Sequence, residues 1–220
     1  MSIARPSFSV RRELLVFGAW ALLAPGAGLT AGRPVPVVTL LGDSITAGYG
    51  LPAAAALPAR LQAALSRLGV ATRVRAAGVS GDTAADGLAR LDFSVEPDTA
   101  LCVVALGGND LLQGIDPKVT QASLDRIVHR LKARGIAVLL AGLSAPKIIG
   151  AGYARDFDAV FPKVARAQGV PLYADLLAGV EGRPGLLQRD GVHPDAAGAA
   201  IIAARLAPIV ARALSSRRHG

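Results

Sequence analysis

Several residue types that build binding sites are scarce in this sequence. Its 220 residues include one cysteine and three histidines. A single cysteine, Cys102, excludes a disulfide within the chain and a zinc site made of several thiolates. The three histidines (His129, His193 and His219) exclude a histidine-rich metal cluster. Any histidine-dependent chemistry must therefore draw on a very short set of candidates.

Aromatic residues are also few, and charge is not concentrated. Aromatic residues make up 4% of the chain and charged residues 18%, whereas 52% are hydrophobic, which excludes intrinsic disorder. The formal net charge is +8, but the basic residues are spread along the sequence. Nucleic-acid sites usually combine clustered positive charge with stacking aromatic residues. We therefore predict no nucleic-acid partner.

The first 31 residues have the order of a secretory signal peptide. A basic start containing Arg11 and Arg12 precedes an apolar run of about ten residues (14–23, LLVFGAWALL), and small residues follow. A membrane span needs about 20 residues, so this run is too short. We predict a signal peptide over 1–31, a mature domain over 32–220, a periplasmic or secreted location and no stable membrane anchor. The arginine pair leaves the twin-arginine route open, and an uncleaved anchor is the alternative.

Short apolar runs alternate with helical patterns through the rest of the chain. We expect five strands, over 35–41, 72–76, 100–106, 136–143 and 170–173. We expect helices over 58–68, after Asp82, and over 121–134, 153–168 and 195–214. Continuous apolar strands suit a sheet that is covered on both faces. The alternation predicts an α/β fold, a three-layer doubly wound (flavodoxin-like) sandwich with a five-stranded parallel sheet.

Polar motifs follow the apolar runs, at the sheet edge where such folds bind ligands. The first expected strand leads into Gly42-Asp43-Ser44, and a serine at the end of a buried strand is well placed as a nucleophile. The G-x-S-x-G elbow of ordinary α/β-hydrolases is absent, because Thr46 stands at the second glycine position. Taken alone, Ser44 fits a helix cap better than a nucleophile, because serine often caps helices.

Two later motifs supply further polar groups. Asn109 follows the third expected strand, and its amide can either stabilise an oxyanion or cap the next helix. Asp190 and His193 are three residues apart in a turn, so the carboxylate can hold the imidazole as a base, unless the histidine is merely solvated. His129 lies off the apolar stripe of its helix and His219 lies in the tail. Elimination therefore selects His193.

Together these motifs resemble the four blocks of the SGNH (GDSL) hydrolases. The matching segments are Gly42-Asp43-Ser44, Val79-Ser80-Gly81-Asp82-Thr83, Gly107-Gly108-Asn109-Asp110 and Asp190-Gly191-Val192-His193-Pro194. The resemblance extends over most of residues 35–212. It is closer to the secreted thioesterase I, lysophospholipase and arylesterase branch of that family.

The resemblance implies a serine esterase that hydrolyses acyl esters or acyl thioesters through an acyl-enzyme, with no metal and no cofactor. Ser44 would be the nucleophile, His193 the base and Asp190 the residue that orients the base. The oxyanion hole would consist of the backbone N–H groups of Ser44 and Gly81 and the side-chain amide of Asn109.

The sequence also departs from the pattern of that branch. Ala76 stands where asparagine is usual, and Leu111 and Gln113 replace a glycine and an arginine that commonly follow the third block. Ile148 and Ile149 replace an Asn-Tyr pair. We expect Leu111 and Ile149 to contact the substrate, and these departures leave the preferred acyl chain open.

Other functions stay open at this stage. The same architecture can host a carbohydrate O-deacetylase or a non-catalytic periplasmic binding module. A metal site formed by Asp190, His193 and Asp195 lacks a convincing fourth ligand. The sequence does not determine the oligomeric state.

Overall fold

The computed structural model describes Met1 and residues 34–216. Residues 2–31 of the predicted signal peptide lie outside these residues, as does His219. The helices and strands named below belong to the unit Pro34–Gly220.

That unit is built on a five-stranded sheet with the order β2-β1-β3-β4-β5. The strands are β1 (Val37–Gly42), β2 (Arg73–Gly78), β3 (Thr99–Ala105), β4 (Ala137–Ala141) and β5 (Leu172–Tyr173). All neighbouring strands are parallel. The predicted doubly wound α/β fold is therefore confirmed, and the chain reverses its direction of winding at β1.

The two central strands explain why the sequence shows unbroken apolar runs. Every residue of β1 and β3 is buried, because helices cover both faces of the sheet at this point. The polar exceptions are Thr39 and Thr99, whose hydroxyl groups lie 2.9 Å apart and hydrogen-bond to each other. Buried polar groups are tolerated when they are paired in this way.

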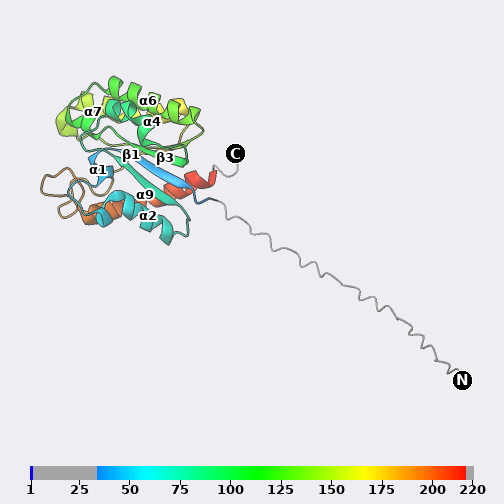
Figure 1. Ribbon diagram of the computed structural model, residues 1–220. Helices are drawn as coiled ribbons and strands as arrows, with labels where there is room; N and C mark the ends of the chain where they lie inside the picture. Colours follow the sequence, from blue (N-terminus) through cyan, green and yellow to red (C-terminus); the bar gives the residue numbers. More distant parts are fainter. Residues whose placement is uncertain (2–33, 217–220) are drawn as a thin grey trace. The chain divides into compact units, whose positions relative to one another are not determined.

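Helices form the two outer layers (Figure 1). They are α1 (Ser44–Ala47), α2 (Leu57–Arg67), α3 (Ala84–Ala89), α4 (Leu91–Ser94), α5 (Gly108–Leu112), α6 (Pro117–Ala133), α7 (Ala151–Asp158), α8 (Val160–Gln168) and α9 (Ala196–Ser216), with 3₁₀ turns at Ala53–Ala55 and Lys147–Ile149. In Figure 1, α2 and α9 lie together on one face of the sheet, and α4, α6 and α7 lie on the other.

The single helix predicted over 153–168 is wrong in one respect, because the structure divides this segment into α7 and α8. Pro162 explains the break. A proline has no N–H to donate, and its ring clashes with the carbonyl four residues earlier, which here belongs to Asp158, the last residue of α7. The chain therefore starts a new helix at Val160, and Ala159 alone separates the two helices.

Among the described helices, α9 is long and apolar enough to match a membrane span by length and composition. Its apolar residues are used for packing instead. Ile202, Leu206 and Val210 are fully buried in the core, where α9 packs against α2 and the sheet. The helix begins after Asp195, whose carboxylate accepts the N–H groups of Ala197 and Gly198 at 2.8 Å each.

Candidate active site

The predicted nucleophile lies where β1 ends and α1 begins. Ser44 is the first residue of α1, and the carboxylate of Asp43 caps the helix by accepting the N–H of Ile45 at 3.0 Å. Gly42 is required just before this turn, since a Cβ atom there would lie 2.5 Å from the carbonyl oxygen of Ala105. The turn therefore holds Ser44 at the carboxyl end of the sheet.

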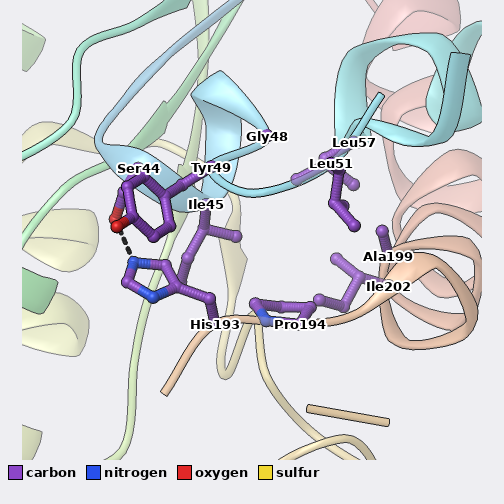
Figure 2. Close-up of a pocket in the computed structure, with 10 residues that line it drawn as sticks. All are labelled: Ser44, Ile45, Gly48, Tyr49, Leu51, Leu57, His193, Pro194, Ala199 and Ile202. Carbon is purple, nitrogen blue, oxygen red and sulfur yellow. Dashed lines mark hydrogen bonds between the residues drawn. The ribbon is translucent and has the colours of Figure 1, made fainter. Parts of the chain in front are cut away.

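The structure brings Ser44, His193 and Asp190 into one hydrogen-bonded chain. His193 Nε2 lies 2.8 Å from Ser44 Oγ (Figure 2), and His193 Nδ1 lies 2.7 Å from Asp190 Oδ2. A base that contacts the nucleophile through one nitrogen and a carboxylate through the other is the arrangement of a serine-hydrolase triad. His129, in contrast, is exposed on α6, as predicted.

Asp190 is held in its ionised form by its own turn. Its second oxygen, Oδ1, accepts the backbone N–H groups of Val192 and His193 at 3.0 Å each. These backbone bonds, and then the bond to the His193 ring, lower the pKa of Asp190 to about 2. The carboxylate is thus negatively charged over the whole physiological pH range and available to orient the imidazole.

Two residues that the sequence analysis did not single out hold the histidine loop in place. The side-chain amide of Gln188 donates to the carbonyl oxygens of Tyr49 and Pro194, at 2.7 and 3.0 Å. The Tyr49 ring lies against the His193 ring, with centroids 4.6 Å apart (Figure 2). No local sequence signal marks this pair, because the contact between Gln188 and Tyr49 spans 139 positions of the chain.

The three predicted oxyanion donors follow three neighbouring strands. Gly81 comes after β2 with φ of +91°, a conformation that favours glycine, Ser44 comes after β1, and Asn109 comes after β3. The Asn109 amide donates to the Asp82 carbonyl at 2.9 Å, which leaves its second hydrogen available. Within the part of the chain that the structure describes, neither the Ser44 nor the Gly81 N–H has an acceptor.

Two buried carboxyl groups beside the site have structural roles. Asp43 is 3% exposed, and this burial raises its pKa to about 6, against the effect of the bond from Ile45. Asp110 is also buried, and it accepts hydrogen bonds from the Ala84 N–H at 2.8 Å and the Thr120 hydroxyl at 2.9 Å. Asp110 therefore joins α5 to α3 and α6 rather than facing a substrate.

Two hollows adjoin these residues. One, of about 10 Å³, is lined by Ser44, His193 and apolar neighbours (Figure 2), and it has room for roughly a single water molecule. The other, of about 190 Å³, is largely apolar. Three of its lining residues directly adjoin Ser44, Asn109 or His193 in the chain, namely Ile45, Gly108 and Val192.

Of the two residues expected to contact the substrate, one lines the larger hollow and the other does not. Leu111 is part of its lining, together with Leu143, Leu177 and Leu187. Ile149 is 42% exposed and is not among the residues that line it. Within the described residues there is no cluster of three or more His, Cys, Asp or Glu side chains that could hold a metal ion.

Comparison with known proteins identifies the family. Residues 40–201 match the GDSL-like Lipase/Acylhydrolase family, a span that contains every predicted triad and oxyanion residue. The chain belongs to this family. Among curated GDSL-like relatives, Esterase TesA of Pseudomonas aeruginosa is 39% identical over 184 residues, which is 83% of this chain and 90% of that protein. Thioesterase 1/protease 1/lysophospholipase L1 of Escherichia coli K12 is 38% identical over 157 residues, 71% of this chain and 74% of that one.

Solved structures of GDSL-like proteins agree with this assignment. A crystal structure of TesA has a TM-score of 0.76 and 36% identity, covering 80% of this chain and 99% of that one. AlinE4, an SGNH-hydrolase family esterase, has a TM-score of 0.69 and 42% identity, covering 82% and 97%. The predicted resemblance to the SGNH (GDSL) hydrolases is thus confirmed.

Proposed function

We propose that this protein is a serine esterase that hydrolyses acyl esters or acyl thioesters through a covalent acyl-enzyme. The observation that carries the proposal is the hydrogen-bonded chain of Ser44, His193 and Asp190, with distances of 2.8 and 2.7 Å. The names of its relatives, which include esterase, thioesterase and arylesterase, support the same reaction class.

In the first half of the reaction, Ser44 Oγ attacks the carbonyl carbon of the substrate while its proton passes to His193 Nε2. Asp190 stabilises the imidazolium that forms. The negative charge on the former carbonyl oxygen is stabilised by the N–H groups of Ser44 and Gly81 and the amide of Asn109. The tetrahedral species then collapses, and His193 gives its proton to the departing alcohol or thiol.

In the second half, water replaces the alcohol or thiol. His193 takes a proton from this water, whose oxygen attacks the acyl group on Ser44. Collapse of the second tetrahedral species breaks the bond to Ser44 Oγ, which recovers a proton from His193. The carboxylic acid is released and the enzyme returns to its starting form, so each cycle consumes one ester or thioester and one water molecule.

The shape and lining of the larger hollow support an apolar acyl group. Its volume of about 190 Å³ and its leucine-rich wall suit an alkyl or aryl chain that lies next to Ser44. A glycan would need many hydrogen-bonding side chains along this wall, where only Ser144 and Glu181 provide them, so the O-deacetylase alternative is not favoured. An aligned triad likewise does not favour a non-catalytic binding module.

We also propose that the protein is exported. The basic, apolar and small-residue order of residues 1–31 supports a cleaved signal peptide. Determination of the N-terminal residue of the protein recovered from the periplasm or the culture medium tests this. A mature chain that begins near Gly32 is expected, and retention of Met1 would contradict cleavage.

The esterase proposal is tested by pre-steady-state hydrolysis of a p-nitrophenyl ester. The expected result is a burst of p-nitrophenol of about one equivalent per enzyme, followed by slower turnover as the acyl-enzyme hydrolyses. An organophosphonate should add once per chain, at Ser44, and abolish activity. A panel of acyl chain lengths, thioesters and glycan acetates then defines the substrate class.

The matched variants are Ser44→Ala, which should abolish both the burst and the labelling, and Ser66→Ala, which changes an exposed serine of α2 and should leave both intact. A chelator should have no effect. Activity that survives Ser44→Ala and is lost on chelation would instead identify a metal-dependent hydrolase.

A further inference from the structure

Arg90, at the junction of α3 and α4, makes an unusual set of contacts beside the site. Its Nε donates to the Asp82 carboxylate at 2.5 Å, and one terminal nitrogen donates to the Gly42 carbonyl at 2.8 Å. The other terminal nitrogen donates to the Ala77 carbonyl and to the Ser94 hydroxyl, at 2.9 Å each. Only 18% of the Arg90 side chain is exposed. One guanidinium group thus ties the carboxyl ends of β1 and β2 to the loop after β2.

These partners stand next to every donor of the proposed oxyanion hole. Gly42 is the last residue of β1, two positions before Ser44. Asp82 directly follows Gly81, and its backbone carbonyl accepts the amide N–H of Asn109 at 2.9 Å. The guanidinium therefore connects the segments that carry all three donors. It reaches Ser44 and Gly81 through their near neighbours Gly42 and Asp82, and it reaches Asn109 through Asp82.

Arginine is suited to this position by its shape. A guanidinium is planar and presents five N–H donors in fixed directions, whereas a lysine ammonium is a compact charge on a flexible stem. Oxyanion donors stabilise the transition state only when they are already in place, and a shift of about 1 Å in a catalytic group can lower the rate about a hundredfold. A rigid group that joins the three donor segments meets this requirement.

We infer that Arg90, paired with Asp82, is a positioning residue that sets the geometry of the oxyanion hole. This inference rests on the proposed esterase function and adds to it a residue that touches neither the substrate nor the triad side chains. It predicts that the loss of Arg90 weakens the chemical step, because the donors are displaced, and leaves substrate binding in the apolar hollow unchanged.

The test is the kinetics of Arg90→Lys on a p-nitrophenyl ester, alone and combined with Asn109→Ala. The single variant should lose about ten- to a hundredfold in kcat, with KM within about twofold of the original protein. In the Asn109→Ala background the same change should cost at least threefold less, because part of what Arg90 positions has already been removed. If Arg90→Lys only reduced the amount of folded protein, kcat would fall by the same factor with and without Asn109→Ala.

Arg134→Lys is the matched control. Arg134 is also largely buried, and it ties α6 to the chain after α4 through the Val95 carbonyl, away from the oxyanion segments. Its replacement should lower the melting temperature without lowering kcat. If Arg90→Lys does not fold, Asp82→Asn replaces it in the same cycle, since it weakens the ion pair while keeping the carbonyl that Asn109 contacts.

The inference is overturned if kcat of Arg90→Lys, or of Asp82→Asn in its place, stays within twofold of the original protein. It is also overturned if the loss of kcat in the double variant equals the product of the losses in the two single variants. Either result leaves the esterase proposal standing, because that proposal depends on the p-nitrophenol burst and its loss in Ser44→Ala.

Discussion

At the scale of single residues, the two N–H bonds of the Asn109 amide have different roles. One donates to the Asp82 carbonyl at 2.9 Å, and the other is proposed to donate to the oxyanion. Loss of one such donor typically costs about a hundred- to a thousandfold in kcat. We therefore expect Asn109→Ala to lower kcat by about that factor with little change in KM, measured by steady-state hydrolysis of a p-nitrophenyl ester.

A glutamine elsewhere provides the control for this variant. Gln62 on α2 bonds through its amide to the Thr72 carbonyl and the Val74 N–H, away from the site. Gln62→Ala should reduce stability but keep kcat. An Asn109→Ala protein with its original kcat would remove Asn109 from the proposed oxyanion hole.

Asp43 gives the stability of the protein a specific pH dependence. Burial raises its pKa to about 6 in the folded protein, whereas an unfolded aspartate titrates near 4. Between about pH 4 and pH 6 the folded state therefore holds a proton that the unfolded chain has lost, and the free energy of unfolding falls as the pH rises. Asp43→Asn should remove this component, which amounts to at most about 3 kcal/mol.

Urea unfolding at several pH values between 4 and 6.5 measures the effect. Asp156→Asn, which changes an exposed carboxylate on α7, should give a curve parallel to that of the original protein. An Asp43→Asn curve that is also parallel would show that the carboxyl group of Asp43 does not titrate in this interval.

Some residues of the site could be predicted from the sequence and others could not, and the difference lies in how each residue acts. Ser44, Asp190 and His193 could be predicted because their chemistry is intrinsic to the residue type and each lies in a short motif at a strand or helix end. Gln188, Tyr49 and Arg90 could not, because ordinary polar and aromatic residues acquire a role only when folding brings distant loops within about 3–5 Å of them.

At the scale of helices and strands, α1 rests directly on the end of β2. A Cβ atom at Gly78 would lie 2.4 Å from the backbone nitrogen of Ala47 and 2.7 Å from the carbonyl carbon of Thr46. Because Ser44 begins α1, Gly78→Ala should displace the nucleophile as well as strain the fold. We expect a stability loss of about 1–3 kcal/mol together with a lower kcat.

Gly152→Ala is the matched control for this substitution. Gly152 lies within α7, and a Cβ atom there would meet nothing within 4 Å. Alanine is favoured over glycine in a helix by about 0.5–1 kcal/mol, so this variant should melt at a higher temperature with unchanged kcat. Thermal unfolding and kcat measured on both variants separate the two effects, and a Gly78→Ala protein with original values would contradict the close contact.

Helices and strands also differ in how well their positions can be predicted from the sequence. The buried strands β1 and β3 produce continuous apolar runs, so their positions could be predicted within two residues. The helices α1 and α5 have four and five residues, too few to show a helical period, so the sequence indicates them only through the possible caps at Ser44 and Asn109. The apolar pattern continues across the break between α7 and α8 and so does not reveal it, although Pro162 marks the place.

At the scale of the whole molecule, the one cysteine reports on unfolding. Cys102 lies in β3 at the centre of the sheet with no exposed surface, and burial raises the pKa of its thiol to about 12. Only a thiolate reacts with a disulfide reagent, so labelling requires the sheet to open. We expect no labelling of the native protein over hours, and esterase activity should not change in the presence of the reagent.

The reference for this experiment is the chain in concentrated guanidinium, which should show one thiol per molecule. Addition of denaturant in small steps should make the labelling rate rise in parallel with loss of activity. Rapid labelling of active protein would instead show that β3 opens locally.

The separation of 149 positions between Ser44 and His193 also has a consequence in time. The chain is made from its amino end, so the nucleophile leaves the ribosome well before the turn that holds its base. A growing chain therefore contains a serine that nothing activates. Hydrolysis can begin only once the turn that holds Asp190 and His193 has folded against α1, so activity requires nearly the whole domain to be complete.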